Sequence, residues 1–388
     1  MSKLQELIKK LCPDGVEFRK LGEVCEIYTG GEPPKDTIKG DNKDEKHVYP
    51  VWANGKEVYG YSSTYKIDKD ATVISSIGAN TGSIYFRKAY FTPIIRLKVL
   101  VPKNNNLISK YLYYYLSTVT FVVKSSSVPN MNANEVKKLE IPLPPLEVQN
   151  EIVRILDTFT SHTAELQAEL QARKEQYEYY RNKLLTFDEN DERVKWMTLG
   201  EVSVNVCSGG TPSTSNKKYY QGHIPWLRTQ EVDWKDVFYT KIKISEDAIK
   251  NSSAKIIPPN CVIVAMYGAT AGKTCINKIP LTTNQACCNL EINKDIALYK
   301  YVYYWLYKEY YKLKALGEGS QSNISGKKIK SYAIPIPPLS EQQRIISILD
   351  KFESLVNDLS EGLPAEIAVV QEQYEYYRNK LLTFKRKS

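Results

Sequence analysis

One segment of this 388-residue chain occurs twice without a change. Residues 175–187 and 372–384 both read Glu-Gln-Tyr-Glu-Tyr-Tyr-Arg-Asn-Lys-Leu-Leu-Thr-Phe. Thirteen identical residues do not recur by chance, so the chain is an internal duplication, and a duplication constrains the fold more than any single motif does. We expect two similar globular units and two similar connecting segments.

Other landmarks recur in the same order. Leu-Gly-Glu-Val stands at 21–24 and 199–202, and Ile-Pro-x-Pro-Pro-Leu stands at 141–146 and 334–339. The offset between copies grows from 178 residues at the first motif to 190 at Gly78 and Gly268, so the second copy accommodates about twelve extra residues. The globular parts share few polar residues, whereas the connectors are nearly the same. This favours a common scaffold that presents two different recognition surfaces.

Composition excludes several classes of protein. With 42% hydrophobic and 25% charged residues, the chain can bury real cores. No stretch approaches about 18 uncharged apolar residues, and the first ten residues alternate charge with apolar side chains, so we expect neither a membrane span nor secretion. The seven cysteines contain no C-x-x-C pair, which disfavours a disulfide framework or a four-thiolate zinc site. The sequence therefore predicts a cytoplasmic protein.

The net charge of +9 is unevenly distributed. Residues 1–146 hold 21 basic and 15 acidic side chains, and residues 188–340 hold 20 and 14. The intervening residues 147–187 and 341–388 are mildly acidic. This pattern favours two anion-facing units on a scaffold that stays off the anion, although chance variation in surface charge would explain it too. We expect each of these four ranges to form one domain of the chain.

Each connector has helical periodicity after its Pro-Pro-Leu. In the C-terminal connector, Ser340 and Gln343 are spaced as a capping box, and the Gly362-Leu-Pro364 break predicts two helices. A heptad seam follows in each copy: Leu166, Leu170, Arg173, Tyr177, Tyr180, Leu184 and Phe187, and then Leu363, Ile367, Val370, Tyr374, Tyr377, Leu381 and Phe384. Two such seams predict an intramolecular coiled coil, with packing of each seam on its own globular unit as the alternative.

Connectivity sets the direction of that coiled coil. The second globular unit joins the end of the first seam to the start of the second, so the helices should run antiparallel. At about 1.5 Å per residue, the 22 residues from Leu166 to Phe187 would span about 33 Å, close to one turn of duplex DNA.

The globular units combine strand-like runs, such as 71–77 and 260–266, with glycine turns and a tyrosine-rich helix, which predicts an α+β fold. Their loops are rich in amide, hydroxyl and cationic side chains of the kinds that read bases and phosphates. For any single residue, a solvated surface loop is the competing interpretation. The candidate DNA-binding residues are Lys35, Lys39, Lys43, Asn54, Asn80, Lys124, Asn130, Asn132, Thr211, Ser213, Asn216, Lys217, Lys218, Arg228, Gln230, Lys273, Gln321, Asn323 and Lys327.

No catalytic centre is evident. The run from Gly268 to Thr274 has three residues between its glycines where a phosphate loop needs four, and no helical pattern follows it. The three histidines, His47, His162 and His223, are not spaced as metal ligands or as a general base. The sequence predicts a non-catalytic protein without a metal or cofactor of its own.

The order unit, helix, unit, helix, together with Leu-Gly-Glu-Val, Ile-Pro-x-Pro-Pro-Leu and the repeated Gln-Tyr-Glu-Tyr-Tyr-Arg segment, resembles the specificity subunits of type I DNA restriction-modification systems. The resemblance covers essentially the whole chain. It implies a prokaryotic protein with two target recognition domains that each read half of a gapped site in double-stranded DNA. The helices would set the gap and bind two adenine-methylating subunits, with restriction subunits further out. S-adenosylmethionine and ATP would then be bound by the partners only.

Two other classes remain open. A free-standing DNA-modifying or DNA-cutting enzyme would need an active site, which the sequence does not show. A structural adaptor that binds only proteins would explain the coiled coil but not two equally basic units. Docking on the helices is expected to involve Leu166, Leu170, Tyr177, Tyr180, Leu184, Leu363, Ile367, Tyr374, Tyr377 and Leu381.

Overall fold

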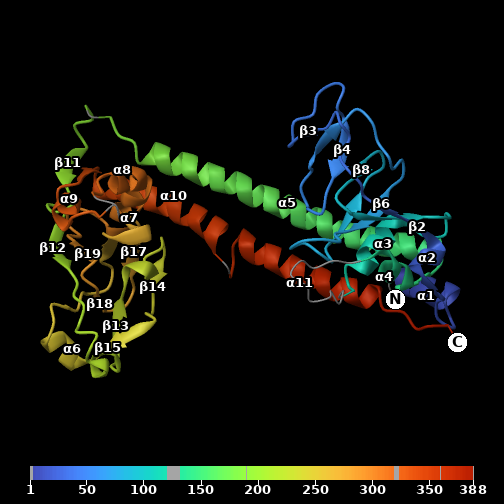
Figure 1. The fold of residues 1–388 in the computed structure, drawn as a ribbon. Helices are drawn as coiled ribbons and strands as arrows, with labels where there is room; N and C mark the ends of the chain where they lie inside the picture. Colours follow the sequence, from blue (N-terminus) through green and yellow to red (C-terminus); the bar gives the residue numbers. More distant parts are fainter. Residues whose placement is uncertain (1–2, 120–131, 189, 319–322, 359, 388) are drawn as a thin grey trace. The chain divides into compact units, whose positions relative to one another are not determined.

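The computed structural model describes residues 3–119, 132–188, 190–318, 323–358 and 360–387. Three candidate DNA-binding residues, Lys124, Asn130 and Gln321, lie outside these ranges. The chain divides into two compact units, which we call unit 1 (Met1–Ala168 with Glu366–Ser388) and unit 2 (Glu169–Ala365) (Figure 1). Unit 1 is therefore built from both ends of the chain, whereas unit 2 is one continuous segment.

Unit 1 begins with helix α1 and ends its globular part with strand β10. Its elements are α1 (Lys3–Leu11), β1 (Phe18–Lys20), α2 (Leu21–Val24), β2 (Cys25–Thr29), β3 (Ile38–Lys39), β4 (Tyr49–Trp52), β5 (Gly60–Ser62), β6 (Ala71–Ile74), β7 (Ile84–Arg87), β8 (Thr92–Pro93), β9 (Lys98–Pro102), α3 (Ser109–Leu116), α4 (Ala133–Lys138) and β10 (Glu140–Pro142).

Two four-stranded sheets and one strand pair form the β-structure of unit 1. The strand orders are β2-β9-β6-β7, β3-β5-β4-β8 and β1-β10. The central strand β6 is buried at every position because its residues Ala71–Ile74 face α3 on one side and a small apolar cluster on the other. Tyr111 and Tyr114 of α3 are fully buried, so the tyrosine-rich helix is part of the core, as the periodicity predicts.

Unit 2 repeats this arrangement. Its elements are β11 (Lys195–Thr198), β12 (Ser203–Ser208), η1 (Lys217–Tyr220), β13 (Ile224–Leu227), η2 (Thr229–Glu231), β14 (Asp236–Val237), β15 (Ile242–Ile244), α6 (Glu246–Lys250), β16 (Val262–Ala265), η3 (Gly268–Thr270), β17 (Thr274–Asn277), β18 (Thr282–Thr283), β19 (Cys287–Ile292), α7 (Tyr299–Lys308), α8 (Tyr310–Ala315), α9 (Gly326–Lys330) and β20 (Ala333–Ile336).

The larger sheet of unit 2 has one strand more than its counterpart. Its order is β12-β19-β16-β17-β14, and β14 pairs in parallel with β17 at the edge where the described sheet of unit 1 ends with β7. Strand β14 lies within the stretch where the second copy is longer. The extra residues thus form an added edge strand and the turn at Trp234 before it.

The connectors are three helices. Helix α5 (Leu146–Leu184) is continuous over 39 residues, and its first part belongs to unit 1 and its last part to unit 2. Helices α10 (Leu339–Asn357) and α11 (Leu363–Leu381) form the second connector, so the break predicted at Gly362 is confirmed. The predicted capping box is wrong, because α10 begins at Leu339 after Pro338 and has no side-chain cap.

The predicted α+β architecture with two repeated globular units and helical connectors is confirmed, and so are the strands within 71–77 and 260–266. The glycine run at 268–274 leads into strand β17 and not into a helix, as expected. The division at residues 146, 187 and 340 stays a prediction. Among the described helices, none is both long and apolar enough to cross a membrane.

Candidate nucleic-acid interface

A buried glutamine attaches α5 to the globular part of unit 1. Gln149 is fully buried, although an unpaired amide would be costly there. Its Oε1 accepts a hydrogen bond from the Ile108 backbone N–H at 2.9 Å, and its Nε2 donates to the Asn106 and Pro144 carbonyls at 2.8 Å each. One side chain therefore joins the start of α3, the loop before it and the proline turn before α5.

Unit 2 repeats this glutamine clamp at Gln342, which is also fully buried. Its Oε1 accepts from the Leu298 N–H at 2.9 Å, and its Nε2 donates to the Ile296 and Pro337 carbonyls at 3.1 and 2.9 Å. The two clamps explain physically why a glutamine follows each Pro-Pro-Leu. They fix the direction in which each helix leaves its globular part.

Aromatic stacking joins the helices within each unit. In unit 1, the ring of Phe159 on α5 stacks on Tyr377 of α11 with centroids 5.6 Å apart. In unit 2, Phe352 of α10 stacks on Tyr180 and Tyr177 of α5 at 5.5 and 6.2 Å. The antiparallel coiled-coil arrangement is confirmed, but the predicted seam-to-seam pairing is wrong at these positions. Each tyrosine contacts the first helical segment of the other connector, because that segment also has apolar residues at helical spacing.

The predicted docking residues face inward to different degrees. Leu166, Tyr177, Leu363 and Ile367 are buried. Half-buried are Leu170, Tyr180, Leu184, Tyr374 and Leu381. Tyr377 is 40% exposed, and its neighbour Tyr376 and the equivalent Tyr179 are each 58% exposed. The outward tyrosine of each repeated segment was not among the predicted docking residues, because heptad spacing selects only the inward positions.

A glycine turn follows the central strand in each unit. Gly78 and Gly82 of unit 1 have φ of 83° and 91°, and Gly268 and Gly272 of unit 2 have φ of 77° and 84°. This left-handed backbone favours glycine. A Cβ atom on Gly78 or Gly268 would meet nothing within 4 Å, so conformation and not crowding requires glycine there. The open space also means that a ligand could approach this backbone closely.

A second loop packs beside each glycine turn, and we call the pair in each unit its paired loops (53–57 with 76–83, and 228–233 with 267–273). In unit 1, Asn54 Oδ1 accepts from the Ser76 N–H at 2.8 Å. In unit 2, the Thr270 hydroxyl donates to the Thr229 carbonyl at 2.9 Å. The structure thus brings together five predicted residues on equivalent loops: Asn54 and Asn80 in unit 1, and Arg228, Gln230 and Lys273 in unit 2.

The remaining predicted residues are spread over other loops. The exposed side chains are those of Lys35, Lys39, Lys43, Asn80, Asn132, Thr211, Ser213, Lys217, Lys218, Gln230, Asn323 and Lys327, and the half-buried ones are those of Asn54, Asn216, Arg228 and Lys273. Lys217 and Lys218 share the short helix η1, and Lys327 lies on α9. Each unit therefore offers several separate cationic positions and one set of paired loops.

Some predicted residues already have a local structural role. Asn132 caps α4 by accepting from the Glu135 N–H at 2.9 Å, and Asn216 caps η1. Arg228 lies 3.4 Å from Glu231, and Lys273 forms an ion pair with Asp233. These cations would exchange a carboxylate for a phosphate on binding DNA, which costs part of the interaction. A role for these residues in DNA binding stays a prediction.

Sequence reasoning missed two exposed aromatic side chains. Phe238 and Tyr239, between β14 and β15, are 64% and 78% exposed, and Lys235 and Lys241 flank them. Aromatic rings beside cations are suited to stacking on bases. The detectable signal was two adjacent aromatic residues in a charged stretch.

The thiols and carboxylates of the described residues form no recognisable reactive centre. All seven cysteines are free, and burial raises the pKa of Cys25 and of Cys288 to about 12, so both remain thiols at neutral pH. Within the described ranges, no three His, Cys, Asp or Glu side chains are arranged to hold a metal ion. The geometry defines a duplicated binding protein, in which two related units present different loop side chains and like helices connect them.

Comparison with known proteins agrees with this class. Residues 13–176 and 192–369 each match the family described as type I restriction modification DNA specificity domain. The chain is 35% identical over 404 aligned residues to the type I restriction enzyme EcoR124I/EcoR124II specificity subunit of Escherichia coli, covering 99% of this chain and 98% of that protein.

Solved structures share the fold. A type I restriction-modification system S subunit from M. genitalium superposes with a TM-score of 0.62 at 16% identity, covering 95% of this chain and 96% of the other. The HsdS subunit from Thermoanaerobacter tengcongensis gives 0.52 at 17% identity, with coverage of 96% and 97%. The chain belongs to the type I restriction-modification specificity family, carries the specificity domain twice, and is a recognition subunit without catalysis of its own. The resemblance in its motifs is confirmed.

Proposed function

We propose that each unit reads one half of a bipartite, gapped site in double-stranded DNA, and that the paired loops supply the side chains that read it. The observation that carries this proposal is the contrast within the duplication. The loops have the same backbone turns but different side chains, Asn54 and Asn80 against Arg228, Gln230 and Lys273, whereas the connectors keep identical residues. The two half-sites therefore differ in sequence.

Amide side chains and arginine suit this reading. An amide pairs two hydrogen bonds with adenine, and arginine pairs two with guanine, while lysine holds phosphate. The exposed lysines outside the paired loops, such as Lys217 and Lys218, then supply affinity without sequence preference. Binding weakens steeply as salt concentration rises, because bound phosphates release counterions.

The helices set the gap between the half-sites and bind the catalytic partners in the cytoplasm. Complexes of this family include modification and restriction subunits as well as DNA. The identical segments 175–187 and 372–384 each expose an outward tyrosine, Tyr179 and Tyr376, to the same extent. Two equal docking surfaces would bind two adenine methyltransferase subunits, with restriction subunits joining those. S-adenosylmethionine and ATP are bound by the partners.

A chimera tests the reading of half-sites. Residues 1–140 are exchanged for the corresponding segment of a relative with a different target, and adenine methylation is mapped in cells that also express the methyltransferase. One half-site should switch while the other half-site and the gap stay the same. A matched chimera in residues 199–333 should switch the opposite half. If both halves change in one chimera, or neither does, the units do not read DNA independently.

A further inference from the structure

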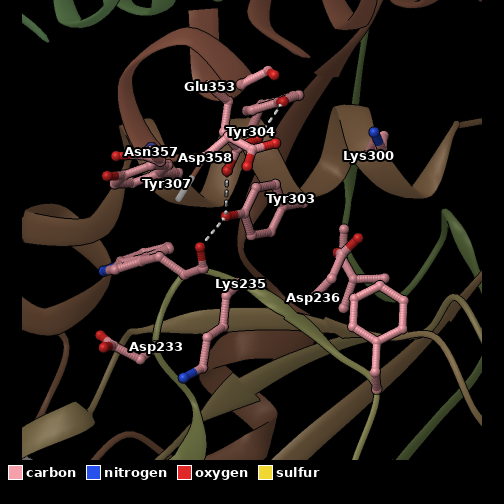
Figure 2. A pocket seen from close by; sticks show the side chains of 14 residues that line it. Asp233, Lys235, Asp236, Lys300, Tyr303, Tyr304, Tyr307, Glu353, Asn357 and Asp358 are labelled. Atoms are coloured by element: carbon pink, nitrogen blue, oxygen red, sulfur yellow. Dashed lines mark hydrogen bonds between the residues drawn. The ribbon is translucent and has the colours of Figure 1, made fainter. Parts of the chain in front are cut away.

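A cavity in unit 2 borders the paired loops at Asp233 and contains side chains to which neither DNA reading nor helix stacking assigns a role. It encloses about 650 Å³ between α7, the end of α10 and the turn before β14 (Figure 2). This volume suits a small organic ligand or the end of a long side chain. Its walls include Trp234, Tyr303 and Tyr307, and a carboxyl group, Glu353, lies at its α10 side.

The duplication supplies an internal comparison for this site. In unit 1, Lys110 and the Tyr114 hydroxyl both bind Asp157, and the Tyr114 oxygen lies 3.4 Å from the Thr160 hydroxyl. Unit 2 repeats the arrangement with Lys300, Tyr304 and Asp350. Where unit 1 has Thr160, however, unit 2 has Glu353. The second copy thus has a carboxyl group and the Trp234 turn at one cavity, and the first copy has neither.

Glu353 and the neighbouring Asp350 share one hydroxyl group, which cannot donate to both carboxylates at once. The Tyr304 oxygen lies 2.6 Å from Asp350 and 2.6 Å from Glu353, as Figure 2 shows for the second contact. A hydroxyl has one proton to donate, so it serves one carboxylate at a time. The Tyr303 hydroxyl is 3.5 Å from Glu353 and donates more closely, at 2.9 Å, to the Trp234 carbonyl. Burial, opposed in part by the Tyr304 hydrogen bond, raises the pKa of Glu353.

The other carboxylates at the cavity have partners of their own. Asp236 pairs with Lys278 at 3.3 Å, and Asp233 pairs with Lys273. Lys300 is engaged by Asp350 at 2.7 Å. Within the described chain, Glu353 has no ion pair. Lys300 attracts Glu353 but is paired with Asp350, so the buried Glu353 carboxyl holds a proton or binds a positive charge from outside.

The aromatic wall already accepts a guanidinium group on its far side. Arg181 lies 4.1 Å from the centre of the Tyr307 ring, and Trp234 stacks on the same tyrosine at 4.3 Å. Tyr307 and Trp234 line a neighbouring hollow too, where the Tyr177 hydroxyl is buried without a hydrogen-bond partner among the described residues. Electron-rich rings and an unpaired carboxyl are the two features that bind organic cations.

We propose that this cavity is a binding site for an organic cation, a guanidinium or primary ammonium group, whose charge pairs with Glu353 between Trp234 and Tyr303. Aromatic rings beside the carboxyl group favour an organic cation, whose charge they attract. It could come from a free small molecule or from a basic side chain of a bound protein, and both share this chemistry. Unit 1 lacks both Glu353 and the Trp234 turn at the corresponding place, so the site is specific to unit 2.

Agmatine, which carries a guanidinium and an ammonium group, is the probe. Its binding to the full chain is measured by isothermal titration calorimetry at low salt. The wild type should bind one equivalent saturably. Glu353→Gln, and Glu353→Thr with the residue of unit 1, should bind about tenfold more weakly or not at all. Glu372→Gln removes an exposed carboxylate on α11 and should bind as the wild type does.

Far-UV circular dichroism and DNA binding show whether each variant is folded. Equal agmatine affinity in the wild type and a folded Glu353→Gln variant would overturn the proposal, and so would the absence of saturable binding to the wild type. A second arm identifies the source. If excess agmatine or Glu353→Gln weakens the complex with the methyltransferase, the cation is a side chain of that partner; otherwise it is a free small molecule. The first arm needs neither DNA nor partner, so it stands apart from the proposed function.

Discussion

Lengthening α5 changes the gap between the half-sites by an amount that can be worked out. The perturbation is a duplication of residues 167–170, Gln-Ala-Glu-Leu, where the helix passes from unit 1 to unit 2. These residues already lie in a continuous helix, so the added turn should be helical as well. In coiled-coil terms, four extra residues are a stutter, which unwinds the pair locally without breaking it.

Four residues lengthen a helix by about 6 Å, and base pairs in DNA rise about 3.4 Å each, which gives close to two base pairs. Four residues also rotate the helix by about 400°, or about 40° beyond a full turn. DNA with 10 to 10.5 base pairs per turn rotates about 35° per base pair. The excess helix rotation of about 40° therefore corresponds to about one base pair. We therefore expect a gap longer by one or two base pairs.

The assay is a genome-wide map of adenine methylation in cells that express the variant with its methyltransferase. Both half-sites should be unchanged and the gap longer. Replacing residues 167–170 by four alanines keeps the length and should keep the gap. A three-residue insertion turns the helix by about 300° and should leave little methylation, because the units are then about 60° out of phase. Altered half-sites, or full methylation with the original gap, would refute the ruler.

Gln342→Ala removes the partner of three backbone groups, the Leu298 N–H and the Ile296 and Pro337 carbonyls, and should lower the free energy of unfolding by about 3 kcal/mol in urea titrations, with a similar loss for Gln149→Ala. Tyr179→Ala or Tyr376→Ala should each reduce bound methyltransferase from two copies to one in native mass spectrometry. Because burial raises the pKa of Glu353, its contribution to the free energy of unfolding is present below its unfolded pKa and declines as pH rises through its folded pKa; Glu353→Gln should flatten that decline.

Each of these has a control. Gln343 is exposed, so Gln343→Ala should leave stability within about 0.5 kcal/mol of the wild type. If a variant with both Tyr179→Ala and Tyr376→Ala still binds two methyltransferase copies, these tyrosines are not part of the docking surfaces. An unchanged pH profile in Glu353→Gln would mean that Glu353 titrates alike in both states. A loss below about 0.5 kcal/mol in Gln342→Ala would mean that water replaces the clamp.

The duplication and the element types could be predicted because they rest on local patterns. Identical segments, strand-like apolar runs and the Gly362 break each determine structure within a few residues. The strands and the helix break lie at the residues that these patterns predict. The buried tyrosines of α3 and α7 followed from helical spacing in the same way.

The pairing of the helices could not be predicted from spacing alone. Phe159 and Phe352 are apolar residues at helical positions just as the seam residues are, so periodicity does not say which face meets which. The glutamine clamps bear on which helix faces meet, because they fix the direction in which each helix leaves its globular part. The paired loops were equally hidden, because Asn54 follows a strand of one sheet and contacts Ser76 after a strand of the other, and no local pattern shows that two sheets pack together.

The closure of unit 1 by residues 385–387 has a consequence for proteolysis. The Val16 N–H donates to the Lys385 carbonyl at 2.9 Å, and the Lys387 N–H returns a bond to Val16 at 2.9 Å. Unit 2 is one continuous segment, whereas unit 1 is complete only when residues 366–387 pack against its N-terminal residues. Proteolytic removal of residues 385–387 would therefore open unit 1 at Val16, which is buried, and leave unit 2 whole.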